Sequence, residues 1–485
     1  MFDRKDSTAR NMAVSAIVWL VLAITLGLIQ ALEFIAPDLF AGIPWLVFPR
    51  IRQVHVNGLA FGWLSMAMVA GWYYIVPRLT RSDIHSERLG NIVMALWNVA
   101  LAVGLVGILL GYTQAREYAE LAWPIDIAMM VVLLLTSYNL LRTIAAREVE
   151  HLYVSLWYIM GSLIWFPIVY AIGNVIWAPP TGSLTGLNDA IWGWFYGHAI
   201  LGLWFTTGTV ALIYYIVPKE IKRPLYGYSL ALIAFWFLAF FYTAVGAHHI
   251  LQSPIPEWLK TIAVITSMGM LIPVFAFIVN VFMTMRGSWR VAHYSIPLRF
   301  AVTGAGFYLL VSFQGSTQAL RGFNLFIHFT NWSVAHAHLA LLGFVAFTLF
   351  GTVYYIFPRI SGCGLYSERL AWVHWWLTFT GFLVFFSVLT AAGLTQAGDF
   401  AQGIPTVAIL PAVRTMWIGR AAAGTVIIVA QYIFAYNMAQ TLRGKQSASE
   451  VAAKARTVVG APTATAGLTA PTAPAAPPTP TATEA

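Results

Sequence analysis

Residues 327–344 read IHFTNWSVAHAHLALLGF and place His336 and His338 inside an otherwise apolar run. Two positions correspond to about 200° of rotation around an α-helix, so the two imidazoles leave opposite sides of it. They are poorly placed to share one metal ion, but each could bind a different one. Histidines inside membrane helices are costly and rare, and they commonly mark functional sites. Two core histidines bonded to neighbouring helices are the alternative explanation.

The composition around this run excludes an ordinary soluble protein. Hydrophobic residues make up 59% of the 485 residues, and charged residues only 9%, against roughly 25% in soluble domains. Twelve apolar segments are long enough to cross a bilayer, at residues 13–35, 56–77, 90–112, 123–143, 152–177, 190–217, 226–250, 260–285, 298–321, 331–357, 370–395 and 415–441. The predicted fold is therefore all-α, a polytopic membrane bundle of about twelve transmembrane helices over residues 13–445.

The positive charges indicate how this bundle is oriented. One set of connections holds 20 of the 27 Lys and Arg residues, and the opposite set holds the remaining seven, Arg50, Arg52, Arg116, Lys260, Arg321, Arg414 and Arg420. Under the positive-inside rule the richer set is cytoplasmic, as are both termini, including an N-terminal segment 1–12. The net charge of +9 therefore reflects topology, and no nucleic-acid partner is expected.

The end of the chain has a different composition from the rest. Residues 446–485 form a low-complexity Ala/Pro/Thr segment that cannot bury a core, so a disordered cytoplasmic tail is expected. The single cysteine, Cys363, excludes a disulfide framework, a Cys-x-x-Cys metal site and covalent haem c attachment within this chain.

Six of the eleven histidines fall in the outer third to half of the predicted spans: His55, His198, His248, His249, His336 and His338. Scattered core histidines would not be expected to share one depth. The other five, His85, His151, His293, His328 and His374, lie in or beside connections, where solvated or interfacial roles suffice.

The number of these histidines suits redox metals, because neutral imidazole is a good ligand for iron and copper. His198, His248 and His249 could form a three-imidazole copper site. The remaining three fit one haem with two axial imidazoles and one five-coordinate haem with an open position for a gas.

Five motifs together resemble the catalytic subunit of the haem–copper oxidase superfamily, most closely subunit I of cbb3-type cytochrome c oxidases. The resemblance covers residues 40–440. The motifs are RQVHVNGLAFGW (52–63), TQAREYAELAWPID (113–126), WFYGHAILGLWF (194–205), YTAVGAHHILQSPIPEWL (242–259) and HFTNWSVAHAHLALLGF (328–344).

The resemblance implies a role for each site residue. His55 and His338 would bind a low-spin haem b, His336 a high-spin haem of b type or a variant, and the histidine trio copper B. Tyr242 would be the redox-active tyrosine of the catalytic site. Arg52 and Arg116 would contact the haem propionates, and Glu117 and Glu120 would lie near a calcium site; outer-loop carboxylates could equally be solvated.

The implied activity is that of a terminal oxidase in the cytoplasmic membrane of a bacterium. Electrons would come from cytochrome c through a separate periplasmic subunit carrying haem c or copper A, and O2 would be reduced to water with proton uptake or pumping.

Two residues depart from the family pattern: Gln314 replaces a glutamate and Asn331 an aspartate. The sequence AHAHLALLG (335–343) also resembles that of nitric oxide reductases, which are the main alternative within the superfamily. Those enzymes carry a glutamate at the position of Gly202, four residues after His198, and a second one, on the eighth helix, that would fall near Met270; neither carboxylate is present here. A non-catalytic haem-binding transporter or a proton-relay carrier is a more distant alternative.

Overall fold

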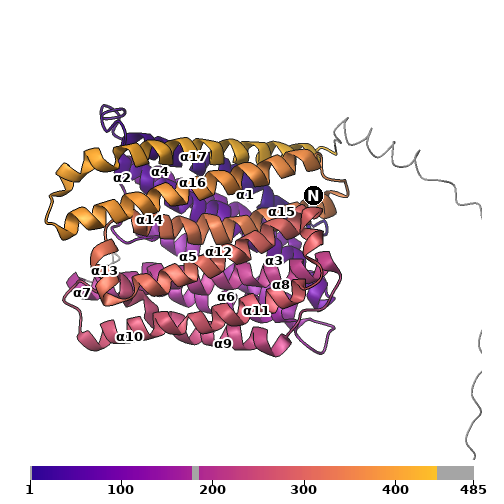
Figure 1. Cartoon of the computed structure of the whole chain (residues 1–485). Coiled ribbons are helices and arrows are strands. Elements are labelled where there is room, and N and C mark those ends of the chain that lie inside the picture. The colour runs from indigo at the N-terminus through magenta and orange to yellow at the C-terminus, as the bar shows by residue number, and fades with distance from the viewer. Residues whose placement is uncertain (1–2, 177–184, 445–485) are drawn as a thin grey trace, which may run out of the picture. The chain divides into compact units, whose positions relative to one another are not determined.

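The computed structural model describes residues 3–176 and 185–444, and it is almost entirely helical over these residues (Figure 1). Twelve of its helical segments are long and apolar enough to cross a membrane. They are α1 (Ser7–Glu33), α2–η1–α3 (Phe48–Thr80), α4 (Glu87–Leu110), α5 (Trp123–Ala145), α6–η2 (Val154–Val175), α7–η3–α8 (Gly186–Ile221), α9–η4 (Tyr228–Ile250), α10–α11 (Glu257–Met285), α12 (Ile296–Gln318), α14–η6–α15 (Asn331–Ser361), α16 (Glu368–Ala401) and α17 (Thr406–Leu442). The predicted helical bundle is therefore confirmed.

Several helices extend beyond their apolar segments. The helix α1 begins at Ser7 rather than residue 13, because the Glu87 carboxylate accepts hydrogen bonds from the amides of Asp6 (2.8 Å) and Thr8 (2.9 Å). The second span begins at Phe48, with Pro49 in its first turn. His55 therefore lies in the third turn of that span.

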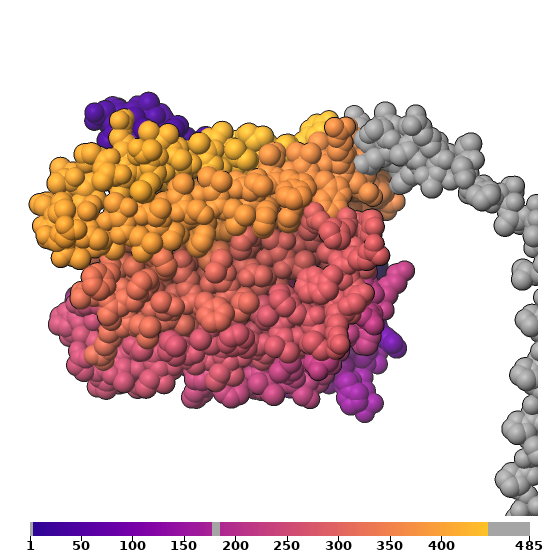
Figure 2. Space-filling view, viewed as in Figure 1, coloured from indigo at the N-terminus to yellow at the C-terminus, as the bar shows by residue number. Residues whose placement is uncertain are grey.

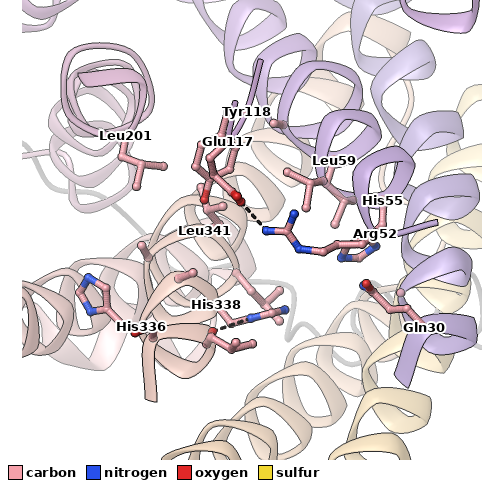
Figure 3. Close-up of a pocket in the computed structure, with 18 of the residues that line it drawn as sticks. Gln30, Arg52, His55, Leu59, Glu117, Tyr118, Leu201, His336, His338 and Leu341 are labelled. Carbon is pink, nitrogen blue, oxygen red and sulfur yellow. Dashed lines mark hydrogen bonds and ion pairs between the residues drawn. The ribbon is translucent and has the colours of Figure 1, made fainter. Parts of the chain in front are cut away.

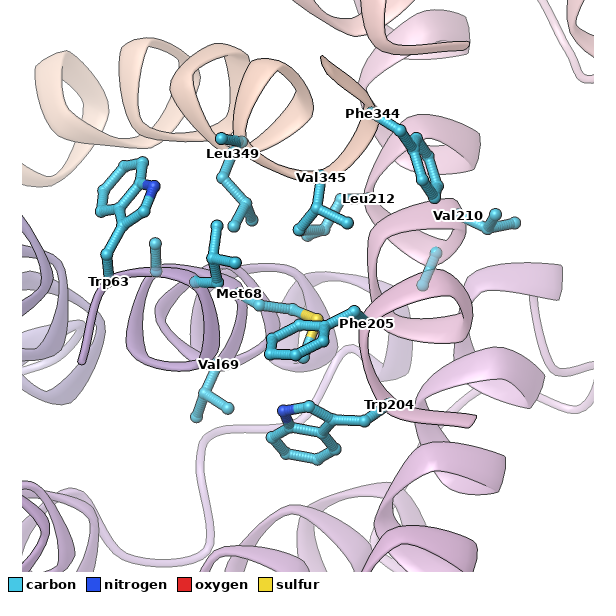
Figure 4. Packing of buried hydrophobic residues seen from close by; sticks show 14 of the residues in the cluster. Trp63, Met68, Val69, Trp204, Phe205, Val210, Leu212, Phe344, Val345 and Leu349 are labelled. Atoms are coloured by element: carbon cyan, nitrogen blue, oxygen red, sulfur yellow. The ribbon is translucent and has the colours of Figure 1, made fainter. Parts of the chain in front are cut away.

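Three spans form the centre of the bundle. In α2–η1–α3, α7–η3–α8 and α14–η6–α15, 94%, 94% and 83% of the apolar window is buried, against 33–61% in the other nine described spans. Large side chains from all three meet there, among them Trp63, Trp204 and Phe344 (Figure 4). The peripheral spans instead expose apolar side chains, such as Phe240 and Trp258, suited to lipid. In Figure 2 helices of the C-terminal half cover the visible face.

Each central span contains a short π-helix: η1 (Gly58–Leu64), η3 (Ile200–Thr206) and η6 (Leu339–Ala346). In each case the wide turn begins within three residues after a histidine, namely His55, His198 or His338. Single π-turns inside α-helices occur frequently at functional sites. The three wide turns therefore directly follow the histidines along their helices.

On the side away from these histidines, each central span ends in a connection, and the three connections are stabilised in the same way. We call this side of the bundle the basic end; it comprises the connections at residues 80–87, 221–228 and 361–368. Asn139, Asn280 and Asn437 each accept a hydrogen bond from a backbone amide in one connection and donate one to the carbonyl of the same residue, at 2.7–3.1 Å. A threonine four residues later accepts a second amide in each copy.

His374 corrects one expectation from the sequence. We expected it in or beside a connection, but it is fully buried in α16 and has partners on both ring nitrogens. Its Nδ1 lies 3.1 Å from the Tyr354 hydroxyl, and its Nε2 lies 3.1 Å from Gln431 Oε1. Because both nitrogens are hydrogen-bonded, His374 is a core histidine and has no ligand atom free.

Candidate metal and cofactor site

The six histidines selected from the sequence line one cavity of about 570 Å³. They come from four different spans, and the central spans supply His55, His198, His336 and His338. Figure 3 shows His55, His336 and His338 around the cavity, with Leu59, Leu201 and Leu341 on its walls. Its size and mostly apolar lining are typical of a site for an organic cofactor.

His198, His248 and His249 form the one cluster in the described residues whose ligand atoms could hold a metal ion, and these atoms lie within 4.8 Å of one another. His198 Nδ1 and His249 Nε2 face each other at 2.8 Å. His248 Nε2 is buried without a hydrogen-bond partner, while its Nδ1 lies 2.7 Å from Ser267 Oγ. Three imidazoles without a carboxylate fit copper.

The other three histidines each have an acceptor at Nδ1. The Nδ1 atoms of His55 and His338 lie 2.8 Å from the carbonyls of Ala23 and Val334, and His336 Nδ1 lies 3.1 Å from Gln314 Oε1. A proton on Nδ1 leaves the lone pair of Nε2 free for a metal, and such bonds orient ligating histidines. These donors therefore fit axial ligation of haem iron.

Two glycines allow side chains of the site to approach neighbouring helices. A Cβ on Gly27 of α1 would lie 2.5 Å from the His55 ring, and a Cβ on Gly202 would lie 2.0 Å from the Tyr242 ring. The Tyr242 ring also lies beside His198, with centroids 5.4 Å apart. Since any side chain at position 202 would collide with Tyr242, the glutamate expected in the rival enzyme and this tyrosine placement exclude each other.

The expected charged residues divide into two groups. Arg52 and Glu117 line the cavity and form an ion pair of 2.6 Å. Arg116 does not line it; it pairs with Asp189 at 2.8 Å and donates to the carbonyl of Gly173.

Glu120 is also absent from the cavity wall and is buried, accepting a hydrogen bond from Asn57 at 2.9 Å. Burial, followed by the neighbouring Glu117 carboxylate, raises the pKa of Glu120 to about 7.

Arg420 is a cavity residue that sequence reasoning missed. We counted it with the outer connections, but it lies fourteen residues inside α17 and is only 5% exposed. Its position within an apolar segment was the available signal, because charges inside spans are rare.

Asn331, one of the two departures from the family pattern, accepts a 2.7 Å hydrogen bond from Trp417 Nε1 at its side-chain oxygen, and its backbone N–H donates to Gln396 Oε1.

Comparison with known proteins identifies the family. The chain is 29% identical to the cbb3-type cytochrome c oxidase subunit CcoN1 of Stutzerimonas stutzeri, over 92% of this chain and 96% of that one. It is 30% identical to a bacteroid cytochrome c oxidase subunit 1 homologue of Bradyrhizobium diazoefficiens, over 88% and 80%. A nitric oxide reductase of Stutzerimonas stutzeri is more distant, at 24% over 83% and 86%.

A solved haem–copper terminal oxidase has the same fold, with a TM-score of 0.75 at 16% identity, over 91% of this chain and 85% of that one. The family model for cytochrome c and quinol oxidase polypeptide I matches residues 7–426. The chain therefore belongs to this family, as the multi-pass membrane subunit I of a haem–copper cytochrome c oxidase.

Proposed function

We propose that the chain reduces O2 to water as the catalytic subunit of a respiratory oxidase, using the histidines in the roles that its sequence implies. His55 and His338 would hold a low-spin haem b, His336 a high-spin haem of b type or a variant, and His198, His248 and His249 copper B. The haems and copper supply electron transfer and O2 binding when bound. The observation that carries the proposal is the convergence of six histidines on one cavity, where four of the six have Nδ1 hydrogen-bonded to an acceptor or hydroxyl.

Tyr242 is proposed as the proton and electron donor of the site. Its ring is tilted by 32° against the His198 imidazole, and its contact with Gly202 leaves no space for another group between the two helices. A phenol can donate a proton through its hydroxyl, which neither Gly202 nor any neighbouring alanine can do. Replacement of Tyr242 by Phe is therefore expected to abolish O2 reduction while keeping the metals.

Copper rather than iron at the histidine trio follows from the ligand set. Position 202 carries no carboxylate, and neither does Met270, near which the second glutamate of the nitric oxide reductases would fall. Three neutral imidazoles suit copper, whereas non-haem iron usually has a carboxylate ligand as well.

The finer assignments concern the surroundings of this subunit. We place both termini and the basic end in the bacterial cytoplasm, because Lys and Arg concentrate there. An electron-donor subunit with haem c or copper A, reduced by cytochrome c, would approach the opposite side.

Glu117 and Glu120 could contribute to a calcium site, with Arg52 positioned for a haem propionate. Arg116 is proposed for the same role as Arg52, although it does not line the cavity and is paired with Asp189. The predicted tail, residues 446–485, lies outside the described residues.

The decisive experiment is a reduced-minus-oxidised absorption spectrum of the purified complex together with metal analysis. We expect bands of b-type haem and one copper for every two haems of this subunit. Absence of haem b would contradict the redox function, and an extra iron in place of copper would favour NO reduction.

A further inference from the structure

Arg420 is a buried cation without a partner in the described part of the chain. Its Nε and Nη1 atoms are inaccessible and have no hydrogen-bond partner. None of the seven ion pairs among the described residues includes Arg420. It is also deep in the structure, three residues along α17 from Trp417, which is itself bonded to Asn331.

The guanidinium lies close to the part of the cavity that holds His55 and His338. Its Cζ is 4.8 Å from the centroid of the Phe34 ring and 6.0 Å from that of Phe385. The Phe385 ring centroid is in turn 4.9 Å from that of His338. Arg420, Phe385 and both histidines line the same cavity. Arg420 thus lies one aromatic ring away from an expected axial ligand.

The Phe34 and Phe385 rings contact the Arg420 guanidinium, but they have no oxygen or nitrogen atom to accept hydrogen bonds from the N–H groups in the guanidinium plane. A guanidinium has five such donors in a fixed fork, which matches the two oxygens of a carboxylate. Burial of an unpaired charge is strongly unfavourable, so a buried arginine is expected to have an anionic or strongly accepting partner.

The other two arginines of this region already have such partners. Arg52 is paired with Glu117, and Arg116 is paired with Asp189. Glu33, which ends α1 next to Phe34, accepts a hydrogen bond from the backbone of Phe48 and forms no ion pair with Arg420, although its Oε2 atom is buried without a hydrogen-bond partner. Within the described residues the remaining place for a partner of Arg420 is the cavity itself.

We infer that Arg420 binds a carboxylate substituent of the haem held by His55 and His338, and that its charge raises the reduction potential of that haem. The inference rests on the proposed function. A nearby positive charge disfavours the oxidised haem, which carries one more positive charge than the reduced form. Loss of the cation would remove this effect and would also leave the carboxylate uncompensated, and both changes lower the reduction potential of the haem.

The test is a spectroelectrochemical titration of the low-spin haem in the assembled enzyme, comparing wild type with Arg420→Gln and Arg420→Lys. We expect Arg420→Gln to lower the midpoint potential by a tenfold or greater change in the ferrous-to-ferric ratio, about 59 mV for one electron. Arg420→Lys keeps the charge but loses the fork, so its potential should lie between the two. Arg414→Met on the exposed side of α17 is the matched control and should leave the potential unchanged.

Selective loss of the low-spin haem from Arg420→Gln, with copper retained, would also support the assignment. Wild-type potentials in both Arg420 variants would overturn it. If Arg420→Gln does not assemble, Arg420→Lys decides the question, because a wild-type potential and haem content there would contradict recognition by the fork. A wild-type enzyme without low-spin haem b would instead overturn the proposed function, so the two failures are distinguishable.

Discussion

The two ends of the three central helices differ in how similar they are to one another. At the basic end the helices finish with nearly the same sequence, YYIVPR (73–78), YYIVPK (214–219) and YYIFPR (354–359). Arg78, Lys219 and Arg359 each lie over a tyrosine ring of their own helix, at 3.5, 5.6 and 3.7 Å. In the same three copies, Asn139, Asn280 and Asn437 make paired hydrogen bonds to the backbone of the adjoining connection, and we call these three arrangements the asparagine locks.

At the opposite end the same helices carry different histidines with different partners. His55 is bonded to a backbone carbonyl, His198 faces another histidine, and His336 is bonded to Gln314. The repeated end therefore serves the fold, where one solution can be used three times. The variable end is where we propose that the metals bind, and each metal would require its own ligand geometry.

Two glutamine–histidine pairs show the same contrast at the level of single residues. Gln431–His374 and Gln314–His336 both have a bond of 3.1 Å. His374 is bonded on both nitrogens, whereas His336 has one ring nitrogen left for a ligand at the cavity. The count of bonded nitrogens thus distinguishes a core histidine from a candidate ligand.

The largest effect is expected from His248→Ala. Loss of one copper ligand should lower O2 consumption by roughly a thousandfold or more, since a catalytic metal contributes several kcal/mol to the reaction. The measurement is O2 uptake per haem, with copper analysis of the same sample. Asn280→Ala at the basic end is the control, and a similar loss of activity there would erase the proposed division between the two ends.

Glu120 is expected to make stability depend on pH. Its pKa is raised to about 7 from a usual 4.5, so between these values the unfolded chain releases a proton that the folded chain keeps. The free energy of unfolding should therefore fall by about 3 kcal/mol as pH rises through that window, at roughly 1.4 kcal/mol per pKa unit.

The pH effect of Glu120 is measured as the difference in thermal stability between wild type and Glu120→Gln, with calcium chelated. The exposed Glu150→Gln, in the connection between α5 and α6, serves as the control variant. A parallel pH profile of wild type and Glu120→Gln would show that Glu120 titrates normally. Restoration of stability at pH 8 by calcium, in wild type alone, would support the calcium proposal.

A smaller effect is expected from Asn437→Ala. The change removes two hydrogen bonds to Ser367 and leaves its backbone groups buried, which should cost about 2 kcal/mol of stability. Haem spectra and potentials should not change. Because the three locks are alike, Asn139→Ala and Asn280→Ala should destabilise by similar amounts, and widely different values would refute their equivalence.

The smallest effect is expected from Gln314→Glu. A carboxylate at His336 Nδ1 would make the imidazole a stronger electron donor to iron and lower the potential of the high-spin haem. We expect about a tenfold shift of the ferrous-to-ferric ratio, about 59 mV, in a redox titration. Gln431→Glu at the corresponding core pair should leave that potential unchanged; equal shifts in both variants would exclude the direct effect through His336.

Much of this architecture follows from local properties of the sequence. Hydropathy and the alternation of Lys and Arg predict twelve spans, and together they place six histidines at one depth. The fold confirms the spans, and the six histidines line one cavity.

Features that depend on contacts between distant residues could not be predicted in this way. The π-helices after His55, His198 and His338 are not marked by any hydrophobic periodicity in the sequence. The asparagine locks at Asn139, Asn280 and Asn437 join residues more than fifty positions apart. Arg420 and His374 were placed at the surface because position relative to a span boundary does not reveal which partners a side chain meets.

The central claim is that three imidazoles hold copper beside a haem in the variable half of the bundle. Its most direct test is electron paramagnetic resonance and metal quantification of the oxidised, purified enzyme, for wild type and for His248→Ala. The account predicts one copper per two haems in wild type, lost in the variant while the low-spin haem on His55 and His338 is retained. A wild-type enzyme with non-haem iron and no copper, or a variant that keeps its copper, would contradict it.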